Sequence, residues 1–206
     1  MKKLSTSKQM AINMVAAIVS FLIGTGINFV LAPYLVKELG SETYGFIGLA
    51  NNFVQYATIV TSALNSMSGR FISIEYSKGN IDKASRYFSS VLVADLIIAG
   101  VLLLVSSIIT FNIEFILNVP ENLVDSVKIL FALTFATFII SVITAIFTTA
   151  AFVKNKLYIN SLRDIASNTL KLLLVVILFS FFPAKVYFLA MASLASGIFL
   201  LLTNIK

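Results

Sequence analysis

The sequence predicts an all-α fold, a polytopic helical membrane protein with six transmembrane helices. Hydrophobic residues make up 59% of the 206 residues and only 12% are charged, whereas soluble domains hold about 45–50% apolar and about 25% charged residues. The mean hydropathy is +0.98. The apolar residues fall into long runs separated by short charged clusters, which is typical of a chain that crosses a membrane several times.

Six apolar segments are close to or above the roughly 20 residues that cross about 30 Å of hydrocarbon. The first follows basic residues, but it is too long for the apolar region of a signal peptide, so we interpret it as a retained span. The fifth is the weakest, because Lys171 lies inside it. The segments make residues 1–206 one six-span domain, and they cover about residues 10–36, 45–69, 87–111, 127–152, 162–182 and 185–204.

The distribution of basic residues predicts the orientation of these spans. Twelve of the 15 Lys and Arg residues lie at the two termini, in the 70–86 connection and in the 153–171 region. The alternate connections hold only Lys37, Lys128 and Lys185 and are mildly acidic. Because cytoplasmic connections carry the excess of basic residues, we expect both termini to be cytoplasmic.

The composition also excludes several functions. The chain has no Cys and no His, which excludes disulfides, thiolate catalysis, Cys/His metal sites and histidine acid–base chemistry. We expect no metal and no cofactor, and the expectation of no enzyme activity and no catalytic residue follows from the family resemblance described below. The net charge of +6 is dispersed between apolar spans, so it indicates contact with membrane lipids and no nucleic-acid partner.

A stripe of polar side chains runs along the second span. Its members are spaced by four or three residues and therefore share one helical face. Amides that face lipid are expensive, so this face must contact protein or water. Asn and Gln are too large to serve close helix packing, so a hydrated cavity fits the stripe better. The stripe consists of Asn51, Gln55, Thr58, Ser62 and Asn65.

Two further stripes have the same spacing, one in the first span and one in the fourth. Small and hydroxyl residues are common wherever membrane helices pack closely, and we favour packing for both of these stripes. The alternative is that all three stripes line one cavity, which the order of residues alone does not decide. The two stripes are Asn13, Ala17, Ser20, Gly24 and Asn28, and Thr134, Thr137, Ser141, Thr144 and Thr148.

Ionisable residues inside or beside the spans are candidate functional residues, because a charge at membrane depth costs at least about 2.5–3.5 kcal/mol. Asp95 lies in the third span and would need a polar partner or bind a coupling ion. Lys171 shares a helical face with Asp164 and Asn168, although its long stem could instead reach the cytoplasmic interface. Arg70 ends the amide stripe, and it is either a phosphate ligand or an ordinary interfacial arginine.

The connection from residue 70 to residue 86 alternates basic and apolar residues. We expect a helical turn on the cytoplasmic membrane surface, in which Gly79 ends one helix and Asn80 caps the next. Two interpretations remain open for this turn: an anchor for anionic lipid, or a part of the substrate path.

The stretch NFVLAPYLVKELGSETYGFIGLANNFVQYATIV resembles the start of bacterial polysaccharide-biosynthesis flippases, of the multidrug/oligosaccharidyl-lipid/polysaccharide exporter superfamily. Pro33, Leu39-Gly40 and Tyr44-Gly45 are the resembling elements, and SMSGRFISIEYSKGNIDKASRYFSSV continues the similarity into the third span. The resemblance implies a two-lobe exporter of twelve or more spans, whose lobes rock around a cationic cavity. It makes this chain one lobe, the N-terminal half, so that a second C-terminal lobe is missing or a homodimer partner replaces it.

The leading hypothesis is a lobe that flips a polyprenyl-diphosphate-linked oligosaccharide from the cytoplasmic to the outer leaflet of the bacterial plasma (inner) membrane, for cell-surface polysaccharide synthesis. Arg70 and Lys171 would hold the diphosphate, and Asp95 would couple transport to a cation gradient. The amides of Asn28, Asn51, Gln55 and Asn65 would bind sugar hydroxyls. The alternatives are a cation-coupled multidrug exporter of the same superfamily and a membrane scaffold that does not transport.

Overall fold

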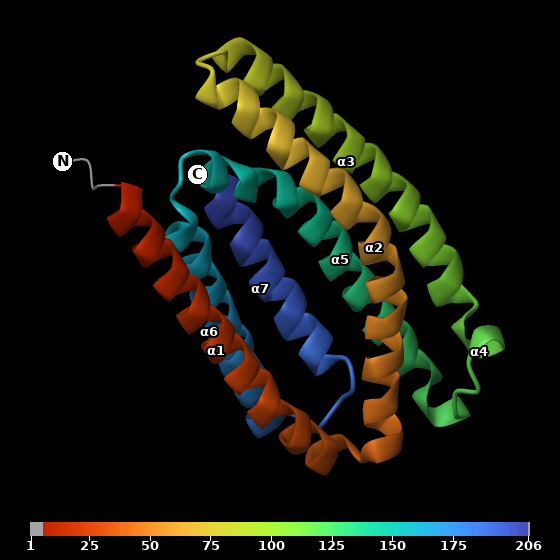
Figure 1. Cartoon of the computed structure of the whole chain (residues 1–206). Helices are drawn as coiled ribbons and strands as arrows, with labels where there is room; N and C mark the ends of the chain where they lie inside the picture. Colours follow the sequence, from red (N-terminus) through yellow and green to blue (C-terminus); the bar gives the residue numbers. More distant parts are fainter. Residues whose placement is uncertain (1–5, 206) are drawn as a thin grey trace.

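Six long helices follow one another along the chain, as the apolar segments predict (Figure 1). The computed structural model describes residues 6–205, except for the side chains of Thr6, Val60, Ala63, Leu64, Met67 and Ser68. The long helices are α1 (Thr6–Leu39), α2 (Ser41–Ser77), α3 (Ile81–Phe111), α5 (Val124–Val153), α6 (Leu157–Phe181) and α7 (Phe188–Ile205). A short helix α4 (Ile113–Ile116) and a 3₁₀ turn η1 (Glu121–Leu123) lie between α3 and α5.

Five of the described helices are long and apolar enough to cross a membrane: α1, α3, α5, α6 and α7, the α5 segment counted with its preceding 3₁₀ turn. The prediction of an all-helical membrane protein is therefore confirmed, while a sixth span is not. Within the described residues α2, which carries the amide stripe, does not qualify, whereas α6 does, although it contains Lys171.

The helices pack in a curved row in which α1 lies on α6, α6 on α7, α7 on α5, and α5 on both α2 and α3. The α1 and α2 helices join at Gly40, whose φ of 81° suits a residue without a side chain. From that corner they diverge toward the other end of the molecule, where α1 and α2 lie on opposite sides of the view (Figure 1). The row is therefore open between α1 and α2.

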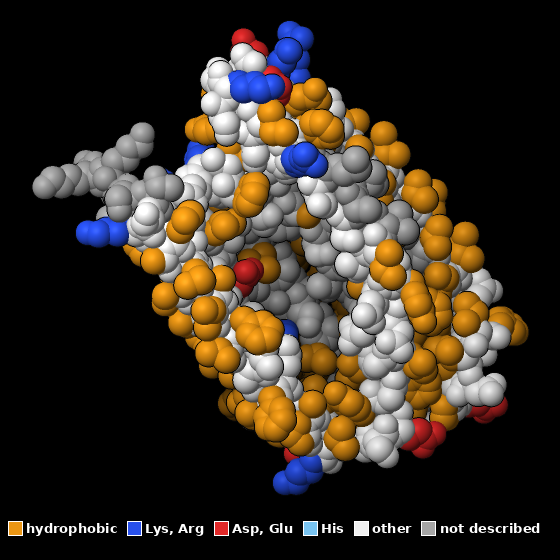
Figure 2. All heavy atoms as spheres, viewed as in Figure 1, with side chains coloured by type: hydrophobic (Ala, Val, Ile, Leu, Met, Phe, Trp, Pro, Cys, Tyr) orange, Lys and Arg blue, Asp and Glu red, His pale blue; other side chains and the backbone are white. Residues whose placement is uncertain are grey.

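The two ends of the bundle carry different charges. The start of α1, the end of α7 and the α2–α3 and α5–α6 turns lie at one end, and the α1–α2, α3–α5 and α6–α7 connections lie at the other (Figure 1). Figure 2 shows basic side chains mainly toward the first end, with acidic ones among them, and both acidic and basic side chains at the second end, which we call the acidic end because its connections hold more acidic than basic residues. At the acidic end Lys128 pairs with Glu114 at 3.1 Å. The connections of the folded chain therefore alternate between the two ends in the order that the basic residues predict.

The α2–α3 turn forms where the sequence predicts it, but Asn80 does not cap α3 with its side chain. Gly79 has a φ of 80° and Asn80 holds the position before α3, yet no side-chain cap bond forms there. The Asn80 amide instead donates to Glu75 Oε2 at 2.9 Å. This hydrogen bond lowers the pKa of Glu75, and Lys78 acts in the same direction.

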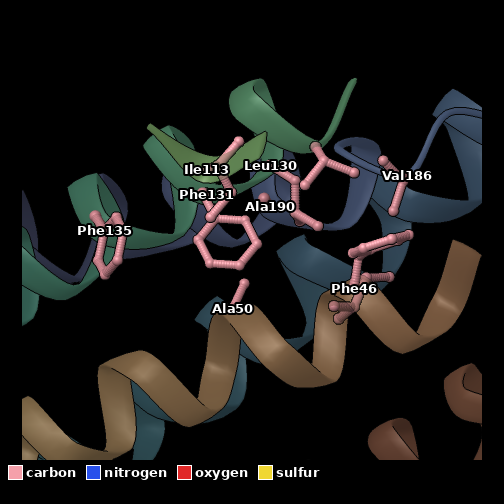
Figure 3. Packing of buried hydrophobic residues seen from close by; sticks show 10 residues of the cluster. Phe46, Ala50, Ile113, Leu130, Phe131, Phe135, Val186 and Ala190 are labelled. Atoms are coloured by element: carbon pink, nitrogen blue, oxygen red, sulfur yellow. The ribbon is translucent and has the colours of Figure 1, made fainter. Parts of the chain in front are cut away.

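A hydrophobic cluster closes the acidic end of the bundle (Figure 3). Phe131 on α5 is fully buried and packs edge-to-face on Phe53 and Phe135 at centroid distances of 5.7 and 6.0 Å. A second cluster, centred on Leu31, Leu35, Val175 and Ala192, joins α1 to α6 and α7. These clusters hold α1 and α2 together at the corner, and the space between the helices opens away from it.

Candidate functional site

A polar groove lies between α1, α2, α5, α6 and α7, and Figure 2 shows its hollow on the side toward the viewer. Its largest part, which we call the main chamber, has a volume of about 620 Å³. Leu31, Leu35 and Ile47, which belong to the hydrophobic clusters, form its apolar floor. Its polar walls are made by Asn28, Asn51, Thr58, Thr134, Thr137, Ser141, Lys171 and Ser193.

The three polar stripes converge on this chamber. Asn28 comes from the first stripe, Asn51 and Thr58 from the second, and Thr134, Thr137 and Ser141 from the third. The packing interpretation holds for part of the first stripe, because a Cβ at Gly24 would lie 3.4 Å from Nδ2 of Asn168 on α6. The hydroxyl stripe of α5, for which we favoured packing, faces the groove.

Lys171 reaches across the groove wall to α1. Its ammonium donates to Asn28 Oδ1 at 3.2 Å. Gly24 lies against Asn168, and the Asn13 side chain donates to Asn155 just before α6. Residues about 143 positions apart in the sequence therefore lie side by side, and α1 and α6 run parallel. Asn28 therefore lies at the same level as Lys171, and the lysine side chain is directed to α1 and not toward the basic end of the bundle.

A second compartment continues from the main chamber toward the basic end, and we call it the upper chamber. It has a volume of about 320 Å³ and shares Thr137, Ser141, Lys171 and Ser193 with the main chamber. Asp164 on α6 adds a carboxylate to its wall. The remaining polar lining residues are Thr144, Thr148, Ser167, Asn168 and Ser196.

The hydroxyl groups of both chambers share one bonding pattern. Thr134, Thr137 and Thr144 donate to backbone carbonyls one turn earlier at 2.7–2.8 Å. Ser141, Thr148 and Ser196 do the same at 2.7–2.8 Å, and Ser167 donates to the carbonyl of Ser196 at 3.1 Å. The protons of these seven hydroxyls are thus occupied, and their oxygen lone pairs remain for the groove. These side chains therefore offer hydrogen-bond acceptors to a ligand.

Arg70 and Asn65 lie at the mouth of the groove near the basic end. They line a further hollow of about 560 Å³ between α2, α5 and α6, which shares Thr148 with the upper chamber. The Arg70 side chain is exposed, and Asn65 Oδ1 is buried with no hydrogen-bond partner among the described residues. The three hollows follow one another from Arg70 to Lys171, each sharing lining residues with the next, and we call this series the polar track.

Two predicted site residues lie apart from this track. Gln55 is exposed on α2 and is not among the described residues that line the chambers. Asp95 is only 2% exposed on α3, a helix that packs against α2 and α5 and borders neither chamber. Its Oδ2 has no hydrogen-bond partner in the described part of the chain.

Sequence reasoning missed the wall that α7 supplies. Ser193 and Ser196 line the groove, but α7 is an apolar segment whose two serines resemble ordinary packing residues. Asp164 shares the helical face of Lys171, which was the available signal for its place in the groove. The Asp and Glu side chains of the described residues form no group of three or more that could hold a metal ion.

Residues 10–206 match the family described as "Polysaccharide biosynthesis protein". The chain is also similar to the "Uncharacterized membrane protein EpsK" of Bacillus subtilis (strain 168), with 33% identity over 187 residues. That similarity covers 91% of this chain but only 37% of the Bacillus protein, so the chain spans well under half of its relative. No solved structure matches the chain.

Proposed function

The chain belongs to the polysaccharide biosynthesis protein family, and from this premise we propose that it is one lobe of a transporter for a lipid-linked glycan. The cargo is a polyprenyl-diphosphate-linked oligosaccharide that moves from the cytoplasmic to the outer leaflet of a bacterial plasma membrane. The polyprenyl chain stays in lipid while the polar head group crosses, so the protein performs no covalent chemistry and needs no cofactor.

The observation that carries this proposal is the polar track itself. Three polar stripes from different helices meet in a groove of several hundred Å³, inside a bundle whose outer faces are apolar. Helix packing alone needs no such space. A head group rich in hydroxyls and phosphates needs both the space and the polar wall.

We assign α2 as the sixth span of this lobe. Asn51 lines the main chamber and Asn65 lines the hollow at its mouth, so these two amides face polar space, and in this proposal that lets α2 cross the membrane beside α5. The groove is open between α1 and α2. A second six-span lobe, or a second copy of this chain, would close it, since alternating access requires two halves facing each other.

Arg70 and Lys171 are the cationic ends of the track. Arg70 is placed to meet the diphosphate at the cytoplasmic mouth, since its planar guanidinium pairs with phosphate oxygens. Lys171 is placed to hold it deeper in the groove. Asn28 and Asn51 in the main chamber and Asn65 at the mouth would bond to sugar hydroxyls, while Gln55 would do so from the open side.

Asp95 remains the candidate for ion coupling, although it lies away from the track. A buried carboxylate oxygen without a partner is costly. A proton or cation that binds there would remove this cost and change the packing of α3 against α2 and α5. In this proposal Asp95 acts on the shape of the lobe and does not touch the glycan.

Export by living cells tests the proposal. We expect Arg70→Ala to reduce surface polysaccharide and to leave the lipid-linked intermediate in the cytoplasmic leaflet. Arg86→Ala is the matched control, because Arg86 is an exposed arginine near the same turn that does not line the described groove. Normal export with Arg70→Ala, in a protein still folded in the membrane, would reject the assigned path and favour a scaffold.

A further inference from the structure

Asp164 is a carboxylate in the groove for which the proposed function has not yet given a role. It lines the upper chamber, and its carboxylate forms no hydrogen bond or ion pair with the side chains that the structure describes. Lys171 lies seven residues further along α6, about 10 Å at 1.5 Å per residue, and its ammonium is directed to Asn28. Asp164 therefore forms no ion pair with Lys171, the cation that lines the same chamber.

The other described residues that line the upper chamber give Asp164 no ion pair either. Six of the chamber hydroxyls give their protons to backbone carbonyls and turn oxygen lone pairs toward the space: Thr137, Ser141, Thr144, Thr148, Ser167 and Ser196. Asn168 donates to the carbonyl of Asp164, one turn earlier on the same helix. Apart from Lys171, which lines the same chamber, the wall around Asp164 thus presents mainly acceptors together with one negative charge, and it favours a ligand that brings donors or positive charge.

The size of the chamber indicates the kind of ligand. A volume of about 320 Å³ lies at the lower end of the range for small organic ligands, about 300–1,000 Å³. It is far larger than the space that encloses a bare cation at about 2.3–2.6 Å from its oxygen ligands. A sugar unit next to a diphosphate held at Lys171 fits the space.

We propose that Asp164 is a specificity-determining residue of the glycan site, and that it selects a sugar with a free amine or neutral hydroxyls over a sugar with a carboxylate. This inference rests on the proposed function. A uronic acid in the upper chamber would place two negative charges close together, whereas an amino sugar would place an ammonium beside Asp164. Exchanging the ammonium for a carboxylate beside Asp164 lowers the affinity by about tenfold.

Binding of three synthetic lipids to the chain in nanodiscs tests the inference. The lipids share a short polyprenyl diphosphate and carry glucosamine, N-acetylglucosamine or glucuronic acid. We expect the glucosamine lipid to bind about tenfold more tightly than the glucuronic acid lipid. Asp164→Asn should reduce this ratio to about twofold and leave the affinity for the N-acetylglucosamine lipid unchanged, while Asp164→Glu should keep the ratio.

Asp125→Asn is the matched control, because Asp125 is an exposed aspartate at the opposite end of the bundle, and it should leave all three affinities unchanged. The inference is overturned if the wild-type chain does not distinguish the amine from the carboxylate, a result that needs no variant. It is also overturned if Asp164→Asn weakens all three lipids equally. Lys171→Met tests the proposed function separately, because Lys171 would hold the diphosphate that all three lipids share. If Lys171→Met weakens none of the three lipids, the proposed function fails, whatever the outcome for Asp164.

Discussion

Replacement of Lys171 by methionine removes the only positive charge that lines the two described chambers. A lysine ammonium has three N–H donors, of which one is directed to Asn28 Oδ1 at 3.2 Å. Two donors remain for phosphate oxygens. Hydrogen bonds to charged groups contribute about 1.5–3 kcal/mol each, and the open side of the groove lets water weaken both. We therefore take about 2–3 kcal/mol for the two hydrogen bonds together, and their removal should lower the affinity about 30- to 150-fold.

The assay is equilibrium binding of a fluorescent polyprenyl-diphosphate N-acetylglucosamine to the chain in nanodiscs. Lys185→Met is the matched control, because Lys185 is exposed in the connection between α6 and α7 at the acidic end. Asn28→Leu should cost less, about three- to tenfold, since it removes only the group that orients the ammonium. A dissociation constant within twofold of wild type for folded Lys171→Met would refute the reasoning.

Three further predictions concern the scaffold around the groove. Phe131→Ala should destabilise the chain by about 3–5 kcal/mol in a denaturant titration, because it removes a fully buried ring, leaves a cavity and breaks two edge-to-face pairs; an equal midpoint would contradict this. Asn13→Ala should destabilise it by about 1–3 kcal/mol in the same titration, because Asn13 accepts from the Tyr158 amide at 3.1 Å and that donor would lose its partner. The pKa of Glu75 is lowered in the folded chain, so its bond from Asn80 stabilises the turn above the ordinary carboxyl pKa and is lost as pH falls through the lowered value. Amide-exchange protection of the turn should fall over that range and should not do so in Glu75→Gln.

The sequence predicts the helices and their polarity well, because apolar length and basic-residue distribution act locally. All six long helices occur at the predicted segments, and their connections alternate between the two ends. The polarity of α2 was visible in its amides, but its failure to qualify as a span by composition was not expected. The charge of Lys171 made the α6 segment look like the weakest span, yet within the described residues it is α2, with its several amides, that does not qualify.

The arrangement of the site depends on which helices become neighbours, and periodicity carries no such information. The spacing of each stripe predicts one polar face, and the structure adds that the faces of α1, α2 and α5 meet. Asp95 has the sequence context of a groove residue but packs behind α2 and α5. Asp164 has the same context and lines the groove.

Thiol labelling tests most directly whether a water-accessible polar groove runs into the membrane-spanning bundle. The chain has no cysteine, so one introduced thiol reports alone. Ser141→Cys lies in the wall shared by both chambers, and Ile97→Cys lies on the outer face of α3, where Ile97 is 64% exposed. Thiols react as thiolates, which require water.

In membranes, a charged, water-soluble thiol reagent should label Ser141→Cys rapidly and Ile97→Cys hardly at all. Polyprenyl-diphosphate N-acetylglucosamine should slow the labelling of Ser141→Cys. If Ser141→Cys reacts no faster than Ile97→Cys, the groove is not open to water and the account of its polar wall is wrong.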